Sequence, residues 1–216
     1  MVIYSANFGD KDKLKTPLVD SSWNKHLKFV YFTDQDFADP VWDIRISNPS
    51  GDARRIARWY KLHSHKLFPG EETIWVDGNI LIVNDPTQFS SIYNHMMVQE
   101  HPYRYDLYEE AEFCGRKKKG EKEDIARQIK FYEEQGHPQL FGLCTSRVLF
   151  RKPTNKVELL NTMWWEEIEK FSSRDQISLP YILWKHNIPF KTVDEEELKV
   201  FFYKRGGHKI RGTREI

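Results

Sequence analysis

The chain has 216 residues, of which 39% are hydrophobic and 14% aromatic, enough for one domain with its own core. Its 33 basic and 32 acidic residues nearly cancel, so the charge gives no reason to expect a nucleic-acid partner. No apolar run approaches the roughly 18–20 residues of a membrane-spanning helix, and no signal-peptide pattern opens the sequence. The two cysteines, Cys114 and Cys144, lack CxxC partners, so we expect a reducing, cytoplasmic location.

The first half of the chain predicts strands around one helix. Apolar runs or alternating patterns predict strands at residues 1–6, 28–32, 42–46, 73–76 and 80–83. A helix over residues 52–66 has Asp52 as its expected N-cap and stops at Phe68-Pro69-Gly70. Strands that alternate with helices predict an α/β fold, in which helices flank a largely parallel central sheet in three layers.

The second half is richer in predicted helices. These cover residues 86–94, 121–135, 154–171 and 175–185, with strands at 148–151 and 190–193 and a basic tail from 200 to 216. No internal repeat and no linker rich in Pro, Gly or Ser divides the sequence. We therefore expect a single domain over residues 1–216.

The most informative motif is Ile74-Trp75-Val76-Asp77-Gly78-Asn79. An apolar strand delivers a carboxylate at its end, where open α/β sheets bind ligands, and Gly78 lets the chain pass close to a ligand. Asp77 and Asn79 can both present oxygen atoms to one hard cation. Asp-Gly is equally a signal for a turn that closes a β-hairpin, so the two interpretations carry about equal weight.

The helix over residues 52–66 places cationic side chains on one face. Arg54, Arg58, Lys61 and His65 follow the spacing i, i+4, i+7 and i+11. Such a face is often simply solvated, but its position just before the Asp77 strand favours Arg58 and Lys61 as ligands of phosphate groups.

Two further segments permit both a functional and a structural interpretation. In the tail, Gly206-Gly207 precedes His208, which could complete a metal shell, although a frayed basic terminus is favoured from the tail alone. Asp175 follows a Ser-Ser-Arg run and is either a helix cap or a carboxylate that hydrogen-bonds a polyol. Nucleophilic hydrolases and metalloproteases are not supported, because G-x-S-x-G, Walker and HExxH patterns are missing from the sequence.

The order of these motifs resembles that of metal-dependent nucleotide-sugar glycosyltransferases of the GT-A fold. More narrowly, the chain is similar to the domain family of plant mucilage-related glycosyltransferases and to the N-terminal glycosyltransferase domain encoded by chlorella viruses. The matching stretches are Val2-Ile3-Tyr4-Ser5-Ala6-Asn7-Phe8-Gly9, Tyr31-Phe32-Thr33-Asp34, Ala57-Arg58-Trp59-Tyr60-Lys61, Ile74-Trp75-Val76-Asp77-Gly78-Asn79, His101-Pro102, Tyr108-Glu109-Glu110-Ala111, Trp164-Trp165-Glu166-Glu167-Ile168 and Arg174-Asp175-Gln176.

The resemblance implies a GT-A-like sandwich whose nucleotide-binding part covers about residues 1–100 and whose acceptor and sugar part covers about 101–216. The implied nucleotide ligands are Ala6, Asn7, Asp34, Arg58, Lys61, Lys209 and Arg211. The implied ligands of Mn²⁺, or of Mg²⁺, are Asp77, Asn79 and His208. Asn79 stands where the family motif usually has a second carboxylate, which weakens the metal assignment.

The implied catalytic and sugar-contacting residues are Asp175, Gln176 and Glu109, with Glu110 as an alternative to Glu109. Glycosyl transfer needs neutralisation of the leaving diphosphate and groups that bind sugar hydroxyls. We therefore expect a metal-dependent enzyme that transfers a sugar from a UDP-sugar to a carbohydrate acceptor with retention of anomeric configuration. The alternatives are a nucleotidyltransferase and a non-catalytic module that binds a sugar nucleotide or carbohydrate. The sequence is also compatible with one domain of a longer protein.

Overall fold

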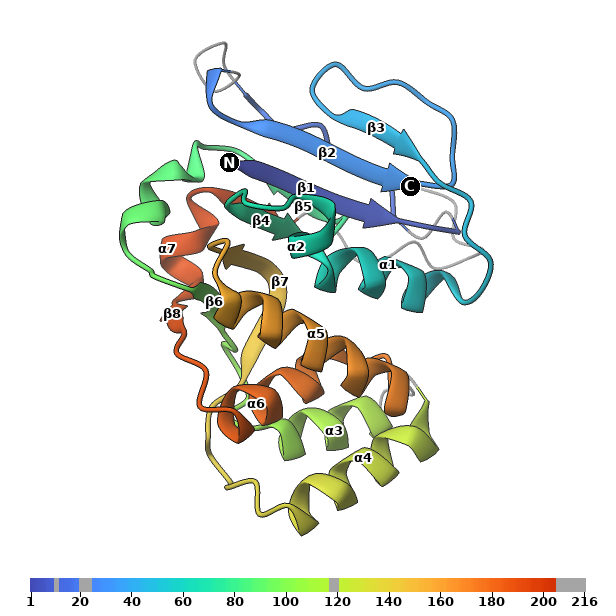
Figure 1. The fold of residues 1–216 in the computed structure, drawn as a ribbon, viewed down its shortest axis with the longest axis vertical. Coiled ribbons are helices and arrows are strands. Elements are labelled where there is room, and N and C mark those ends of the chain that lie inside the picture. Colours follow the sequence, from blue (N-terminus) through green and yellow to red (C-terminus); the bar gives the residue numbers. More distant parts are fainter. Residues whose placement is uncertain (10–11, 20–24, 117–120, 205–216) are drawn as a thin grey trace.

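A computed structural model shows the fold and describes residues 1–9, 12–19, 25–116 and 121–204 (Figure 1). In that part of the chain, seven strands form one sheet in the order β3-β2-β1-β4-β7-β6-β8. These strands are β1 (Val2–Asn7), β2 (Lys28–Thr33), β3 (Asp43–Ile46), β4 (Thr73–Val76), β6 (Met96–Glu100), β7 (Cys144–Arg151) and β8 (Lys191–Val193). Strands β1 to β4 pair in parallel, β7 runs antiparallel to β4 and β6, and β8 is parallel to β6. The predicted α/β sandwich with a mostly parallel sheet is confirmed.

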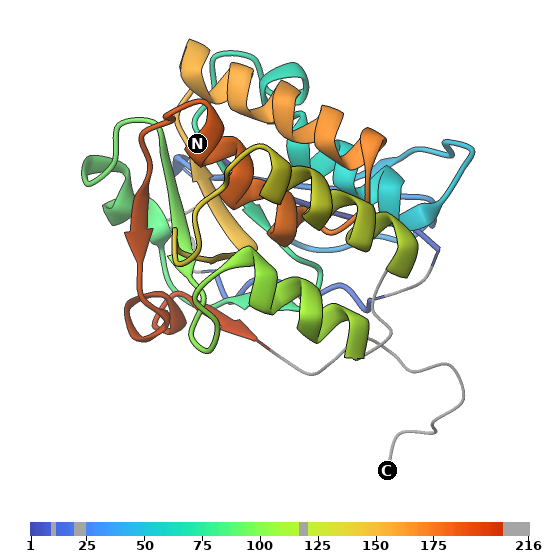
Figure 2. The same cartoon turned by 90° about the horizontal axis from the view of Figure 1, so that it is seen from below.

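The two faces of the sheet are covered differently. One face carries a layer of helices, seen from below in Figure 2, namely α1 (Ala53–Leu62), α2 (Ser64–Leu67), α3 (Leu107–Arg116), α4 (Lys122–Glu134), α5 (Asn155–Lys170) and α6 (Asp175–Lys185). The other face is covered by short elements, namely β5 (Ile80–Ile82), the 3₁₀ helix η2 (Pro86–Ser91), α7 (Glu195–Lys199) and β9 (Phe202–Lys204). Alternate residues of β1 enter the two cores, with Tyr4 on the helical side and Ile3 on the other. This two-sided burial explains why β1 begins with three consecutive apolar or aromatic residues, Val2, Ile3 and Tyr4.

Several predicted elements differ from the structure in ways that matter for the site. The helix predicted over residues 52–66 ends at Leu62, because His63 leaves helical geometry and a separate short helix, α2, follows. Residues 86–91 form a 3₁₀ helix instead of an α-helix. Strand β5 pairs with β9 in a second, two-stranded sheet, so the Asp-Gly turn before it does not close a hairpin with β4. The sequence patterns did not predict β6 and α3. None of the helices in the described ranges is both long and apolar enough to cross a membrane.

One buried cation ties the end of α1 to the sheet. Arg151, at the end of β7, is 1% exposed and donates from Nη2 to the Tyr4 hydroxyl at 2.6 Å and to the Lys61 carbonyl at 2.9 Å. Its Nη1 donates to Asn161 Oδ1 at 3.0 Å on α5. The Lys61 carbonyl belongs to the last turn of α1, where helix carbonyls lack partners within the helix. Arg151 therefore fixes the position from which the Lys61 side chain extends.

We expect Arg151→Leu to lower the free energy of unfolding by about 3–5 kcal/mol, because it removes three buried hydrogen bonds and leaves the Tyr4 hydroxyl oxygen and Asn161 Oδ1 without this donor. Urea titration at neutral pH measures this change. The control is Lys130→Leu on α4, whose side chain is 78% exposed and which should alter stability by less than about 0.5 kcal/mol. An Arg151→Leu protein as stable as the parent would contradict this role of the buried guanidinium.

Candidate active site

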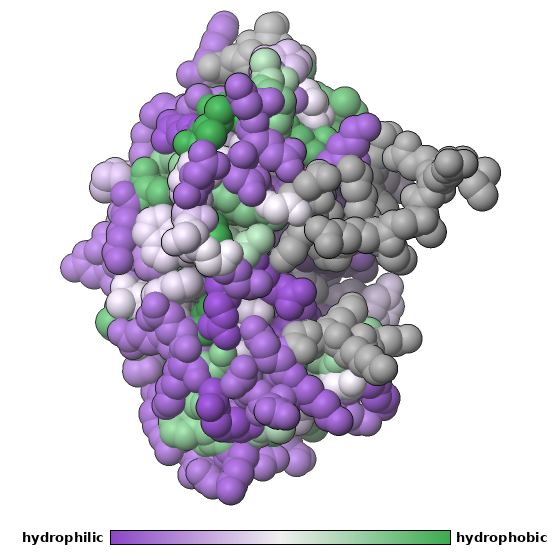
Figure 3. Space-filling model, turned by 90° about the vertical axis from the view of Figure 1, so that its right-hand side faces the viewer, coloured by the Kyte–Doolittle hydropathy of each residue, from purple (hydrophilic) through white to green (hydrophobic). Residues whose placement is uncertain are grey.

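A large cavity of about 870 Å³ lies where β1 and β4 end. Strands β1 and β2 point to the right-hand side of the molecule in Figure 1. Figure 3 shows this side from the front, and most of the coloured surface there is hydrophilic. The cavity walls come from β1, α1, the turn after β4, the loop after β6, α3, β7 and the start of α6. Those walls include Ala6, Asn7, Arg58, Asp77, Asn79, Asp175 and Gln176, all of which the sequence predicted as site residues.

A buried lysine ammonium connects two of the predicted carboxylates. Lys61 has no exposed surface, and its Nζ lies 2.7 Å from Asp175 Oδ2 and 3.2 Å from Asp77 Oδ1. The same Oδ1 of Asp77 accepts a hydrogen bond from Trp75 Nε1 at 2.8 Å. A buried ammonium needs such counter-charges, because removing one from water costs several kcal/mol. Lys61 thus lies beneath the cavity and joins the end of β4 to the start of α6.

Asp175 is engaged on both of its oxygens. Arg58 Nη2 lies 3.2 Å from Oδ1, while Ser146 Oγ on β7 donates to Oδ2 at 2.8 Å. Burial alone would raise the pKa of this carboxyl, but the charges of Arg58 and Lys61 outweigh it and hold the pKa well below its usual range. Asp175 is the first residue of α6, and Arg174 occupies the N-cap position, so the cap interpretation of Asp175 is wrong. Its carboxylate is an anionic counter-ion.

The turn after β4 presents oxygen atoms to the cavity. Asp77 is 29% exposed, and its Oδ2 has no hydrogen bond among the described residues. Asn79 is 8% exposed, and its Oδ1 is a buried acceptor with no hydrogen-bond partner in the described part of the chain. A Cβ on Gly78 would lie 3.1 Å from Asp12 Cβ, so only glycine permits this close approach without a shift.

These oxygens suit Mn²⁺ or Mg²⁺, since such cations take one or two protein oxygens and complete their shell with water and substrate phosphates. The described ranges hold no group of three His, Cys, Asp or Glu side chains that could hold a metal ion. The third predicted ligand, His208, lies outside those ranges, as do Lys209 and Arg211.

A second charge cluster forms the wall on the side of α3. Glu110 is 1% exposed and accepts from Arg104 Nε at 2.6 Å and from Arg174 Nη2 at 3.1 Å. Glu109, which the sequence analysis preferred, is exposed, does not line the cavity and accepts a hydrogen bond from the Tyr105 backbone at 2.8 Å. Adjacent residues on a helix point about 100° apart, and it is Glu110 that faces inward.

Near the end of β1, two of the predicted nucleotide ligands, Asn7 and Asp34, form hydrogen bonds with the backbone of nearby residues. The side chain of Asn7 donates to the Asp12 carbonyl at 2.7 Å, and Asp34 Oδ2 accepts from the Gly9 backbone at 2.9 Å. Gly9 has a φ of +69°, which favours glycine. Ala6 and Asn7 line the cavity, whereas Asp34 is exposed and does not.

The face predicted from the 52–66 spacing is only partly realised. Arg54 and Arg58 line the cavity and Lys61 lies beneath it, but His65, on α2 beyond the break at His63, is adjacent to Asn161 instead. The sequence analysis assigned no role to three other cations of the wall, namely Arg104, Arg147 and Arg174. The one available signal was the position of Arg174 inside the Arg174-Asp175-Gln176 motif.

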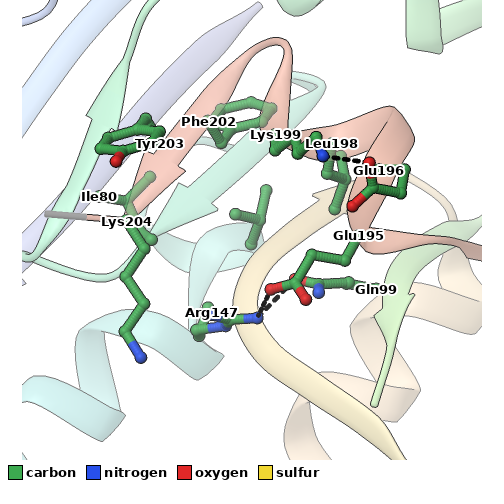
Figure 4. A pocket seen from close by; sticks show the side chains of 11 residues that line it. Ile80, Gln99, Arg147, Glu195, Glu196, Leu198, Lys199, Phe202, Tyr203 and Lys204 are labelled. Carbon is green, nitrogen blue, oxygen red and sulfur yellow. Dashed lines mark hydrogen bonds and ion pairs between the residues drawn. The ribbon is translucent and has the colours of Figure 1, made fainter. Parts of the chain in front are cut away.

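A smaller cavity of about 280 Å³ adjoins the large one and shares Arg147, Glu195 and Lys204 with it (Figure 4). Arg147 Nη2 lies between Glu195 Oε1 at 3.2 Å and Gln99 Oε1 at 3.1 Å. The Arg147–Glu195 ion pair therefore forms the part of the large cavity's wall that lies next to α7.

Comparison with known proteins places this site in a family. The sequence profile of the TOD1/MUCI70 glycosyltransferase-like domain matches residues 40–206, which include Lys61, Asp77 and Asp175. The chain belongs to the TOD1/MUCI70 glycosyltransferase-like domain family. Over 209 residues it is 25% identical to a protein named probable hexosyltransferase MUCI70 from Arabidopsis thaliana. Over 241 residues it is 24% identical to alkaline ceramidase TOD1 from the same plant.

Each match to these members of the TOD1/MUCI70 family covers most of the present chain, 82% for MUCI70 and 93% for TOD1. It covers only 36% of MUCI70 and 52% of TOD1. The chain therefore spans about a third to a half of these relatives. The resemblance to plant mucilage-related glycosyltransferases is confirmed at the level of the domain.

We expect a double-mutant cycle to reveal strong coupling between Lys61 and Asp175. Lys61→Met and Asp175→Asn should each lower the free energy of unfolding by about 3–5 kcal/mol, since each leaves a buried partner charge uncompensated. The double variant should lose at least about 1 kcal/mol less than the sum, as measured by urea titration. The control is the exposed pair Arg127 and Asp124, for which Arg127→Met with Asp124→Asn should show coupling below about 0.5 kcal/mol.

The same variants have a second readout in acid. The ordinary pKa of an Asp carboxyl is 3.8 and that of folded Asp175 is lower, so the unfolded chain takes up the proton first as pH falls. The stability that Asp175 contributes is complete above about pH 4 and is lost below it. Asp175→Asn should therefore show a shallower acid loss than the parent. Additive single effects with parallel acid profiles would contradict the ion-pair assignment.

Proposed function

We propose that this domain transfers a glycosyl group from a UDP-sugar to a hydroxyl of a carbohydrate acceptor. The observation that carries the proposal is the Asp77–Lys61–Asp175 ion-pair chain at the carboxyl edge of the parallel strands, beneath a cavity lined by cations. Membership of a glycosyltransferase-like family and similarity to a probable hexosyltransferase support it.

The proposed donor diphosphate lies over the amino-terminal end of α1. Arg54 and Arg58 line the cavity there, and Arg174 enters it from α6. Arginine is well suited to phosphate oxygens, because its planar fork can donate two parallel hydrogen bonds. The nucleoside would then reach toward Ala6, Asn7 and Phe8. A cation-rich wall favours a diphosphate donor over the uncharged amide implied by the name of the TOD1 relative.

We propose that Asp77 and Asn79 hold Mn²⁺ or Mg²⁺, with His208 as a further ligand. Their fit rests on the Asp77 oxygen without a hydrogen bond and on the orphaned Asn79 oxygen. When bound, the cation would neutralise charge on the leaving diphosphate. The Lys61 ammonium anchors the opposite oxygen of Asp77 and so fixes the direction in which this carboxylate faces.

Gln176 is our candidate for contact with the transferred sugar. It lines the cavity beside Asp175 and has no hydrogen bond among the described residues, whereas the Asp175 oxygens are already paired. Its amide can both donate to and accept from sugar hydroxyls. We therefore propose that Asp175 is a positioning residue, which orients Arg58 and Lys61, and that Gln176 binds the sugar.

We propose that the transfer retains the anomeric configuration, and the ion pairing of acids in the cavity wall supports this. Four carboxylates of the wall, those of Asp77, Glu110, Asp175 and Glu195, are ion-paired with Lys or Arg. A carboxylate whose oxygens are held in an ion pair is poorly placed to take a proton from an acceptor hydroxyl. We propose that the bond from the anomeric carbon to the leaving phosphate breaks while the acceptor oxygen bonds on the same face. The acceptor proton then passes to the departing phosphate oxygen.

The direct test incubates the purified chain with a panel of UDP-sugars and glycan acceptors with Mn²⁺. We expect UDP release together with a new glycoside, whose anomeric configuration NMR compares with that of the donor. Transfer of the UMP group, with release of a sugar 1-phosphate in place of UDP, would indicate a nucleotidyltransferase. Binding of the sugar nucleotide without any turnover would indicate the non-catalytic module. An inverted product would overturn the proposed proton route.

We expect Asp77→Asn to weaken Mn²⁺-dependent UDP binding at least tenfold, because an amide is a weaker ligand of a hard cation than a carboxylate. Isothermal titration calorimetry with and without Mn²⁺ measures the change, and UDP affinity without metal should hardly differ from that of the parent. Glu166→Gln on the exposed face of α5 is the control and should behave like the parent. Parental Mn²⁺ dependence in Asp77→Asn would place the metal elsewhere.

For Gln176→Ala, we expect a fall in kcat of about 10–100-fold, or about 1.4–2.7 kcal/mol in the activation barrier. Because Gln176 is half-buried and without hydrogen bonds in the described ranges, its free energy of unfolding should change by less than about 1 kcal/mol. Steady-state kinetics and urea titration check the two statements. Parental kcat in this variant would remove Gln176 from the sugar site.

A further inference from the structure

A third cavity lies beside the large one on the side of α6. Its volume is about 300 Å³, and it shares His101 and Arg104 with the large cavity. Its remaining walls come from the end of β6, the segment before β7, α6 and β8. The two cavities are therefore separated by one pair of side chains.

The lining of this third cavity is mostly apolar, with Tyr105, Phe141, Leu143, Pro180, Leu183 and Phe190. Its two polar side chains from the strands, Glu100 and Thr192, bond each other, with Thr192 Oγ1 donating to Glu100 Oε1 at 2.6 Å. Burial raises the pKa of the Cys144 thiol to about 12, so this thiol stays neutral, and the charged groups of the lining are Glu100 and Arg104. Such a cavity favours an uncharged, apolar ligand over a charged one.

Apolar side chains are exposed to solvent next to this cavity. Tyr103 is 78% exposed, Tyr105 67% and Leu140 72%. Leu140 has a φ of +58°, which is rare for a leucine, and its backbone donates to Asp106 Oδ2 at 3.4 Å. The loop of residues 101–106 and the segment before β7 are thus held together with their apolar side chains outward. Clustered exposed apolar groups mark binding sites more often than plain surface.

The wall between the two cavities is fixed by charge. Arg104 forms an ion pair with buried Glu110, which also binds Arg174, the neighbour of Asp175 in the chain. A ligand that reaches past Arg104 would therefore have one end in the proposed reaction cavity and the other in the apolar cavity. A molecule that suits both ends is amphiphilic.

We infer that the third cavity binds an apolar alkyl or aryl group of the acceptor, while the acceptor's sugar hydroxyl lies in the large cavity. This inference rests on the proposed glycosyl transfer and adds the chemical class of the acceptor. Burial of each methylene should raise affinity roughly fourfold until the cavity is filled.

The test uses methyl β-glucoside, octyl β-glucoside below its micelle concentration and the uncharged trisaccharide maltotriose as probes. Saturation-transfer NMR titrations measure their dissociation constants for the full chain. We expect octyl β-glucoside to bind at least tenfold more tightly than methyl β-glucoside and more tightly than maltotriose. Tyr105→Ala should reduce that advantage at least threefold, and Tyr105→Phe should restore it.

Tyr203→Ala is the matched control, because Tyr203 is a 55% exposed tyrosine that lines the separate cavity of Figure 4. It should leave the octyl advantage unchanged. Equal affinity for the two glucosides, tighter binding of maltotriose, or loss of the advantage in Tyr203→Ala would each overturn the inference. UDP release from donor hydrolysis without acceptor, measured in parallel on the parent chain, tests the proposed function separately, since it requires no ligand in the third cavity.

Discussion

The arrangement of this site depends on one buried ammonium. Lys61 has no exposed surface, so its charge is tolerated only while Asp77 and Asp175 remain within 3.2 Å and 2.7 Å of it. These two carboxylates come from the end of β4 and the start of α6, which are nearly a hundred residues apart in sequence. The energetic need to neutralise Lys61 therefore sets the distance between the strand end and the helix start, and hence the shape of the cavity floor.

The fold fixes Lys61 from both of its ends. Its carbonyl, in the last turn of α1, accepts from Arg151 at 2.9 Å and from the Tyr4 hydroxyl at 2.9 Å, both of which are buried in the sheet. Its ammonium binds the two carboxylates on the cavity side. The parallel strands β1, β2 and β4 bring their carboxyl ends to one edge, and α1 crosses beneath this edge. The backbone network and the side-chain network thus meet in a single residue.

The sequence predicted those parts of the site that depend on local patterns. The apolar run before Asp77 showed a strand end, and the spacing of Arg54, Arg58 and Lys61 showed one helix face. It could not show that α1 stops at Leu62, because that break depends on packing around His63, and so it misplaced His65. The choice between Glu109 and Glu110 required the rotation of α3, a helix that the sequence analysis did not predict. Strand β6 was missed because its apolar run is short and lacks turn signals at both ends.

The charges of the cavity favour one kind of chemistry over another. Each of four acids has a cationic partner, namely Asp77, Glu110, Asp175 and Glu195. The side chains of Arg54 and Lys204, in contrast, have no hydrogen bond or ion pair among the described residues. His101 also lines the cavity, and burial together with the nearby Arg104 lowers its pKa to about 4, so it is neutral and uncharged at physiological pH. A site that activates a nucleophile needs a free base, whereas a site that stabilises a departing polyanion needs surplus donors in fixed positions. The ion pairs of the four paired acids hold Arg58, Arg104, Arg147 and Arg174 in fixed positions on the wall, and fixed cationic donors are what a departing polyanion requires.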